Sequence, residues 1–151
     1  MVNFEAELTS PSALRKSYLL LSINELANDN RHRSADTALM YREAETFGVD
    51  RRSFGSDLEA LLDKGWIFYE KTSGNPSDVT ITQRGADFAE EFSTFINDPR
   101  RRATAVREAL LQWLYEERLH GTTAPNISGF PNSKYGSFYG KKFTDHEIKQ
   151  A

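Results

Sequence analysis

The chain has 151 residues, of which 38% are hydrophobic and 27% are charged, a composition that argues against wholesale disorder. It contains no cysteine, which excludes disulfides, thiol catalysis, zinc ribbons and iron–sulfur clusters. The formal net charge is −3, and the longest apolar run, Tyr18–Leu21, is far shorter than the roughly 20 residues of a membrane span. We therefore expect a cytoplasmic protein with no membrane partner.

Two helices are expected near the start of the chain, after an N-terminal arm. Ser10 suits the N-cap and Pro11 the first helical position, and apolar residues then continue at helical spacing to Ala27. A shorter second helix is predicted over residues 35–46, with Ser34 as its cap. The apolar positions of this second helix are Ala38, Leu39 and Met40.

A third helix and a β-hairpin are expected next. Asp50 caps the helix and Gly65 ends it, and its core positions recur at helical spacing at Phe54, Leu58, Leu61 and Leu62. After Gly65 the period changes, because residues 66–71 are rich in aromatic and β-branched side chains and residues 79–82 alternate apolar with polar. The turn-forming residues 72–77 lie between these segments, so the sequence predicts a β-hairpin.

Two further helices are expected over residues 83–96 and 99–119. Thr82 caps the first, and Asp98 followed by Pro99 opens the second. Their inward-facing positions follow helical spacing at Phe88, Ala89, Phe92 and Phe95, and then at Val106, Leu110, Trp113 and Leu114.

The order helix, helix, turn, helix, hairpin is that of a winged helix-turn-helix domain. The stretch Gly48–Ile67, which begins GVDRRSF, resembles the packing signature of winged helix transcription regulators. The sequence TITQRG at residues 80–85 also resembles a second wing strand that runs into the following helix. The resemblance covers residues 11 to about 97. It implies a mostly α (α+β) fold with a three-helix core, a β-hairpin wing and additional C-terminal helices.

Three parts of the chain are therefore expected: an N-terminal arm over residues 1–10, a winged helix domain over 11–98, and a third part over 99–151. In the third part, a Gly- and Ser-rich connector precedes Thr144 and Glu147, which form a capping box at the start of another helix. The long helix, the connector and this capped helix resemble the opening of a second winged helix module. The alternative is a C-terminal extension that folds back on the first domain.

The resemblance implies double-stranded DNA as the partner, with the helix at residues 50–64 in the major groove. Arginine is the commonest specific reader of base edges. The expected DNA contacts are Arg51, Arg52, Ser53, Ser56, Lys71, Arg31 and Arg33. A second set of candidate contacts with nucleic acid or a partner is Arg100, Arg101, Arg102, Lys141 and Lys142. Because one winged helix binds DNA weakly, a homodimer or a second winged helix module is also expected.

The uneven distribution of charge along the chain leaves a second interpretation of the function open. Residues 1–98 contain 10 Lys and Arg against 17 Asp and Glu, a net −7, whereas residues 99–151 contain 9 against 5, a net +4. DNA-binding modules are usually basic on at least one face, and Lys71 is the only base near the expected wing tip. The alternative function is a winged helix used as a protein–protein interaction module in an assembly.

No catalytic residue, metal ligand or cofactor is predicted, so we do not expect an enzyme. The histidines at positions 32, 120 and 146 are scattered, and Gln150 stands where a zinc-protease motif starting at His146 needs a second histidine. The sequence contains no glycine-rich phosphate loop and no G-x-S-x-G nucleophile elbow.

Overall fold

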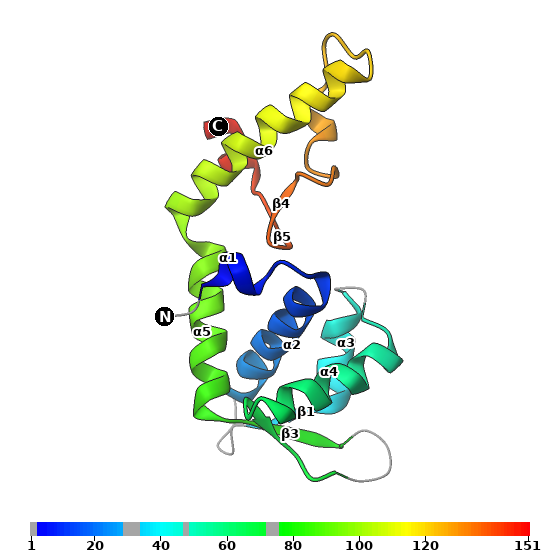
Figure 1. Cartoon of the computed structure of the whole chain (residues 1–151), viewed down its shortest axis with the longest axis vertical. Helices are drawn as coiled ribbons and strands as arrows, with labels where there is room; N and C mark the ends of the chain where they lie inside the picture. The colour runs from blue at the N-terminus through cyan, green and yellow to red at the C-terminus, as the bar shows by residue number, and fades with distance from the viewer. Residues whose placement is uncertain (1–2, 29–33, 47–48, 72–75) are drawn as a thin grey trace. The chain divides into compact units, whose positions relative to one another are not determined.

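The computed structural model describes residues 3–28, 34–46, 49–71 and 76–151 (Figure 1). Within these residues the protein is mostly helical, with seven α-helices and two small antiparallel sheets. The chain divides into two compact units, Met1–Ser93 and Thr94–Ala151, here called the N-terminal and C-terminal units. The boundary between the two units lies within the helix Gln83–Asn97. The sequence predicted a domain boundary after residue 98, just past the end of that helix.

The helices of the N-terminal unit begin at the caps that their sequences provide. The Ser10 hydroxyl accepts a hydrogen bond from the Ala13 N–H at 3.1 Å, and the Asp50 carboxylate accepts one from the Ser53 N–H at 2.7 Å. The predicted start at Pro11 is confirmed. The bounds are α1 Phe4–Glu7, α2 Pro11–Asn28, α3 Thr37–Glu45, α4 Arg51–Asp63 and α5 Gln83–Asn97, of which α5 ends in the C-terminal unit.

A three-stranded antiparallel sheet accompanies these helices. Its strands are β1 (Ser34–Asp36), β2 (Ile67–Phe68) and β3 (Asp78–Ile81), in the order β1-β3-β2. The predicted pairing of the two later segments is confirmed, with Ile67 opposite Ile81. The first strand corrects the prediction of a helix from residue 35 capped by Ser34, because Asp36 caps α3 instead.

The core of the N-terminal unit combines apolar faces of α2, α3, α4, the sheet and α5. Its fully buried members include Leu20, Ile23, Leu58, Leu61, Ile67, Val79 and Ala89. Of the predicted apolar positions of α3, Met40 is buried as expected, whereas Ala38 and Leu39 are exposed. The helix also buries Thr37 and Ala44. After α4, Gly65 adopts a φ of 71°, a left-handed conformation that ends the helix and that favours glycine.

The expected N-terminal arm is tied to the N-terminal unit. Residues Phe4–Glu7 form the short helix α1, and both Phe4 and Leu8 are buried. The Phe4 ring lies 5.5 Å from that of Phe88 and 6.0 Å from that of Phe92, measured between ring centroids. This segment is therefore part of the core rather than a free arm.

The C-terminal unit is built on α6 (Pro99–Leu119), which begins at the predicted cap Asp98. The other elements are the 3₁₀ turn η1 (Ile127–Gly129), the strands β4 (Ser137–Phe138) and β5 (Lys141–Lys142), and α7 (Asp145–Gln150). Their buried side chains form a second core of Val106, Trp113, Phe130 and Phe143. The capping box of Thr144 and Glu147 is present as predicted, whereas the β4–β5 hairpin lies within the segment predicted to be irregular.

One glycine is required by close packing in this hairpin segment. A Cβ at Gly136 would lie 2.3 Å from the carbonyl oxygen of Pro131, a distance that real side chains do not reach. No helix in the described part of the chain is both long and apolar enough to cross a membrane.

Candidate nucleic-acid interface

Four of the predicted contacts lie together in the first half of α4. Arg51, Arg52 and Ser56 are exposed, and Ser53 is half-buried. The helix is anchored at this end by Asp50, whose pKa is held below its usual value mainly by the hydrogen bond from the Ser53 backbone N–H. This end of α4 therefore presents two guanidinium groups and a hydroxyl group to solvent, beside one ionised carboxylate.

The nearest acid within α4, Asp57, does not share that exposed face. Arg15 of α2 donates two hydrogen bonds to the Asp57 carboxylate, from Nε at 2.7 Å and from an Nη at 2.9 Å. The Asp57 side chain is only 1% exposed, and the pKa of Arg15 is raised chiefly by this hydrogen bond. The ion pair fixes α4 against α2 and removes one negative charge from the candidate interface.

A groove with a volume of about 620 Å³ lies beside Arg51. The Arg51 guanidinium lies over the Tyr41 ring at 5.3 Å from its centroid, which restrains this side chain. The groove also contains both signs of charge, from Asp36, Arg42 and Glu45. It is therefore a mixed surface next to α4 and not a continuous basic channel.

Lys71 is the one Lys or Arg among the described residues of the hairpin, 67–71 and 76–81. Lys71 lies 3.7 Å from the Glu59 carboxylate of α4, with both side chains well exposed. Burial and the nearby charges of Glu59 and Asp63 raise the pKa of Tyr69. Lys71, which was predicted to contact DNA, thus lies near α4, and its charge is partly balanced by Glu59. The predicted contacts Arg31 and Arg33, and the turn residue Gly48, lie outside the described residues.

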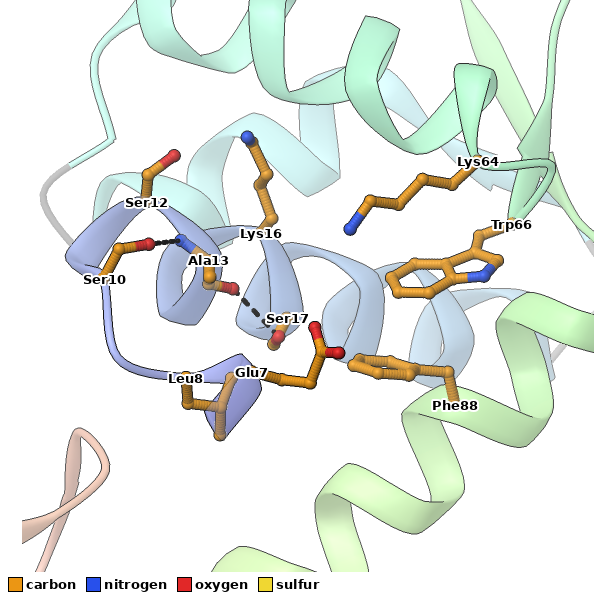
Figure 2. A pocket seen from close by; sticks show the side chains of 10 residues that line it. All are labelled: Glu7, Leu8, Ser10, Ser12, Ala13, Lys16, Ser17, Lys64, Trp66 and Phe88. Atoms are coloured by element: carbon orange, nitrogen blue, oxygen red, sulfur yellow. Dashed lines mark hydrogen bonds between the residues drawn. The ribbon is translucent and has the colours of Figure 1, made fainter. Parts of the chain in front are cut away.

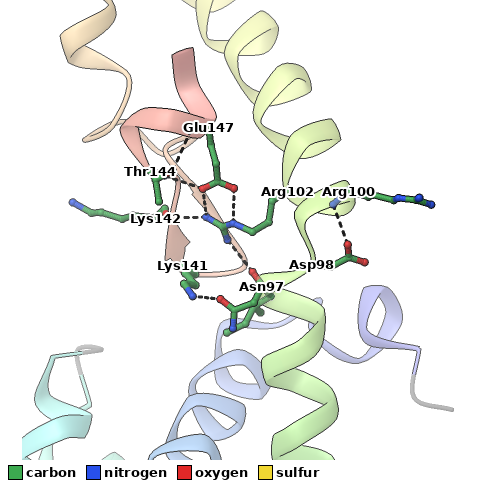
Figure 3. Close-up of polar contacts among 9 residues, drawn as sticks. Asn97, Asp98, Arg100, Arg102, Lys141, Lys142, Thr144 and Glu147 are labelled. Carbon is green, nitrogen blue, oxygen red and sulfur yellow. Dashed lines mark hydrogen bonds and ion pairs between the residues drawn. The ribbon is translucent and has the colours of Figure 1, made fainter. Parts of the chain in front are cut away.

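The prediction for Arg102 is wrong, because its side chain is buried in the C-terminal unit (Figure 3). The guanidinium donates two hydrogen bonds to Glu147, at 2.7 and 3.0 Å. It also donates to the carbonyl oxygens of Ile96 and Lys142, at 2.9 and 2.8 Å. With its donors used inside the protein, Arg102 joins α5, β5 and α7 to α6 and offers nothing to a phosphate.

The other predicted cations of the C-terminal unit remain on its surface. Arg100 is exposed, and Arg101 lies 3.4 Å from Asp98 and over the Phe95 ring. Lys141 donates a hydrogen bond to the Asn97 side chain, as Figure 3 shows. Lys142 is exposed and lies 3.5 Å from the side-chain oxygen of Asn132. Arg100 and Arg101 lie at the start of α6, and Lys141 and Lys142 lie in the β4–β5 hairpin. We assign none of them a contact with nucleic acid or with a partner.

The sequence did not predict a small pocket in the N-terminal unit (Figure 2), with a volume of about 110 Å³. Its wall is a stacked pair of rings, Trp66 and Phe88, with centroids 4.2 Å apart. Lys64 lies over the Trp66 ring at 4.6 Å, and Lys16 and Glu7 also line the pocket. The pocket is too small for a nucleotide and, because Glu7 is present, it is not uniformly basic.

Comparison of the chain with known proteins gives no information about this interface. No protein-family model, curated protein or solved structure matches the chain. Among the residues that the structure describes, no group of three or more His, Cys, Asp or Glu side chains could hold a metal ion.

Proposed function

We propose that the N-terminal unit is a winged helix-turn-helix domain that binds double-stranded DNA, with α4 in the major groove. The observation that carries the proposal is the arrangement at the start of α4. Arg51, Arg52 and Ser56 are exposed there, and Asp57 is buried against Arg15. The exposed acids are Asp50 at the N-cap and, further along α4, Glu59 and Asp63. A helix that enters the major groove contacts base edges through its N-terminal residues, so cations exposed at that end suit such a contact.

The arrangement of elements supports this proposal. The helices α2, α3 and α4 share one core with the sheet, and the β2–β3 hairpin follows α4 directly. In a helix-turn-helix protein the second helix of the motif enters the groove, which corresponds to α4 here. The core therefore holds α4 rigidly from one side, through Leu58 and Leu61, and leaves its opposite side for the duplex.

The two arginines are suited to different contacts. Adjacent helix positions point about 100° apart, so one side chain can enter the groove while the other follows the backbone. Arg51 is restrained over Tyr41, which suits a fixed phosphate contact. Arg52 is exposed and suits bidentate reading of guanine through O6 and N7. We therefore assign base reading to Arg52 and the backbone contact to Arg51.

Substitution of these arginines tests the proposal, using a site selected from a random duplex library. Arg52→Ala is expected to weaken binding to the selected site by about 1–3 kcal/mol, and binding to random DNA much less, because a base contact acts only in the specific complex. Arg51→Ala is expected to weaken both alike and to reduce the salt slope by about one. Fluorescence anisotropy with the full chain measures both.

Lys149→Ala provides the control, because it removes an exposed positive charge from α7 and is expected to leave affinity unchanged. Thermal unfolding of each variant checks that stability is preserved. The proposal is contradicted if the double variant Arg51→Ala/Arg52→Ala binds selected and random DNA as tightly as the unmodified chain.

A protein partner for the same unit is the second candidate function. It is favoured by Phe68 of β2, which is 59% exposed, and by the acids Glu59, Asp63 and Glu70 near the hairpin. An exposed aromatic ring among acidic groups fits a protein surface better than a phosphate backbone. If Phe68→Ala abolishes capture of a partner protein while the chain shows no affinity for DNA, this second function takes precedence.

A further inference from the structure

The C-terminal half of α6 is apolar on two opposite sides. One side, which includes Val106 and Trp113, is buried in the core of the C-terminal unit. On the other side, Leu111 and Tyr115 are 68% and 60% exposed, and Leu119 is 66% exposed. At 100° per residue, Leu111 and Tyr115 lie about 160° around the helix from Trp113. The residues at positions 111, 115 and 119 recur at i, i+4 and i+8, so they form one continuous stripe, here called the α6 stripe.

The charges that flank the α6 stripe are oppositely signed and free to pair. Glu108 lies at one end of the stripe and Arg118 near the other, and both are exposed. Neither side chain has an ion-pair partner within the described part of the chain. Other charged groups of this unit, such as Arg102 and Glu147, are paired. The α6 stripe thus resembles a protein–protein interface, in which an apolar centre is bordered by charged groups.

We propose that two copies of this chain associate through the α6 stripe, with the two helices antiparallel around a two-fold axis. In the register that places Leu111 opposite Tyr115 of the second copy, Glu108 lies opposite Arg118 of that copy. The two-fold axis repeats both contacts, so the surface is self-complementary, as a closed dimer requires. In the same register Leu119 lies opposite Arg107, whose aliphatic stem can cover it. This inference does not depend on DNA binding.

Charge reversal tests the proposed pairing. The expected result for the full chain in sedimentation velocity is a dimer that dissociates on dilution. Glu108→Arg or Arg118→Glu alone is expected to raise the dissociation constant at least about tenfold, because each creates two like-charge contacts across the axis. The double variant Glu108→Arg/Arg118→Glu restores opposite charges and is expected to recover dimerisation. Arg100→Glu is the control, since it makes the same charge change as Arg118→Glu at an exposed position of α6 outside the stripe.

Cysteine cross-linking tests the register, and the absence of native cysteines makes the result unambiguous. A mixture of Glu108→Cys and Arg118→Cys chains is expected to form a disulfide-linked pair under mild oxidation. Glu108→Cys alone is expected to remain unlinked, because positions 108 of the two copies are offset by ten residues, about 15 Å along an antiparallel pair. A disulfide spans no more than about 7 Å between Cα atoms.

Three outcomes overturn the proposal. The first is a chain that stays monomeric at every concentration. The second is a dimer that the single charge reversals leave unchanged or that the double reversal fails to restore. The third is efficient cross-linking of Glu108→Cys with itself, which indicates a parallel pair. All of the substituted side chains are exposed, so circular dichroism is expected to show the folded protein in every case.

Discussion

Replacement of Arg102 by alanine is expected to lower the free energy of unfolding of the C-terminal unit by about 3–5 kcal/mol. The substitution removes four hydrogen bonds and leaves Glu147, whose side chain is only 20% exposed, without its counter-charge. The carbonyl oxygens of Ile96 and Lys142 also lose their donor. Because the Glu147 carboxylate keeps some contact with water, we expect a loss near the lower end of this range.

Urea unfolding followed by tryptophan fluorescence measures this loss. The chain has two tryptophans, and a Trp66→Phe background leaves Trp113, which is buried in the C-terminal unit, as the reporter. Arg100→Ala is the control, because this neighbouring arginine is exposed and its removal is expected to cost less than about 0.5 kcal/mol. Equal losses for the two variants would show that Arg102 is not the buried connector of the unit.

The same pair gives the stability a defined pH dependence. The hydrogen bond from Arg102 is the main reason that the pKa of Glu147 lies below its ordinary value of 4.5. A carboxylate with a lowered pKa stabilises the folded state above the unfolded-state value, and this contribution is lost as pH falls through the folded-state pKa. The unmodified unit is therefore expected to lose stability below about pH 4.5, and Arg102→Ala is expected to lose less over the same range.

Leu58→Ala is expected to destabilise the N-terminal unit by about 2–5 kcal/mol. Leu58 is 1% exposed and packs in the core that holds α4 against the rest of the unit. Its truncation removes buried apolar contacts and leaves a cavity that the neighbouring helices can fill only in part. Because α4 carries the candidate interface, the same variant is expected to weaken DNA binding at temperatures near its unfolding midpoint.

The matched control is Leu39→Ala in α3. It makes the same chemical change at a side chain that is 46% exposed, so we expect a loss of less than about 0.5 kcal/mol. Urea unfolding followed by far-ultraviolet circular dichroism measures both variants. If Leu58→Ala is no more destabilising than Leu39→Ala, the assignment of this face of α4 to the core is wrong.

The starts of α2, α4, α6 and α7 could be predicted because each depends on residues that are adjacent in sequence. Pro11, Asp50, Asp98 and Thr144 all act within one turn of the helix that they begin, and the structure places a helix after each of them. The strand β1 could not be predicted in this way. It has only three residues, and its formation depends on pairing with β3, which is distant in sequence.

The buried ion pairs could not be identified from the sequence, because their partners are far apart along the chain. Asp57 pairs with Arg15, 42 residues away, and Arg102 pairs with Glu147, 45 residues away. The sequence nevertheless indicates that one charged residue of each pair lies on the buried face of its helix. Asp57 is spaced i+3 from Phe54, and Arg102 precedes Val106 by four residues, so each charged side chain lies on the apolar face of its own helix.

The arrangement of the candidate interface could be predicted only in part. The exposed positions of Arg51, Arg52 and Ser56 follow from the helical period, once Phe54 and Leu58 are assigned to the core. The ion pair between Lys71 and Glu59 depends on how the hairpin lies beside α4, which no local pattern determines. The sequence alone therefore could not show that Glu59 partly balances the charge of Lys71 in the hairpin.

The measurement that tests DNA binding most directly is a salt series. The full chain is titrated into a labelled random-sequence duplex at increasing salt, and fluorescence anisotropy gives the association constant at each concentration. If the exposed cations of the N-terminal unit contact phosphates, the logarithm of the association constant falls linearly with the logarithm of the salt concentration, by about 0.9 for each phosphate contacted. Binding that is absent at low salt, or that does not change with salt, contradicts the proposed function.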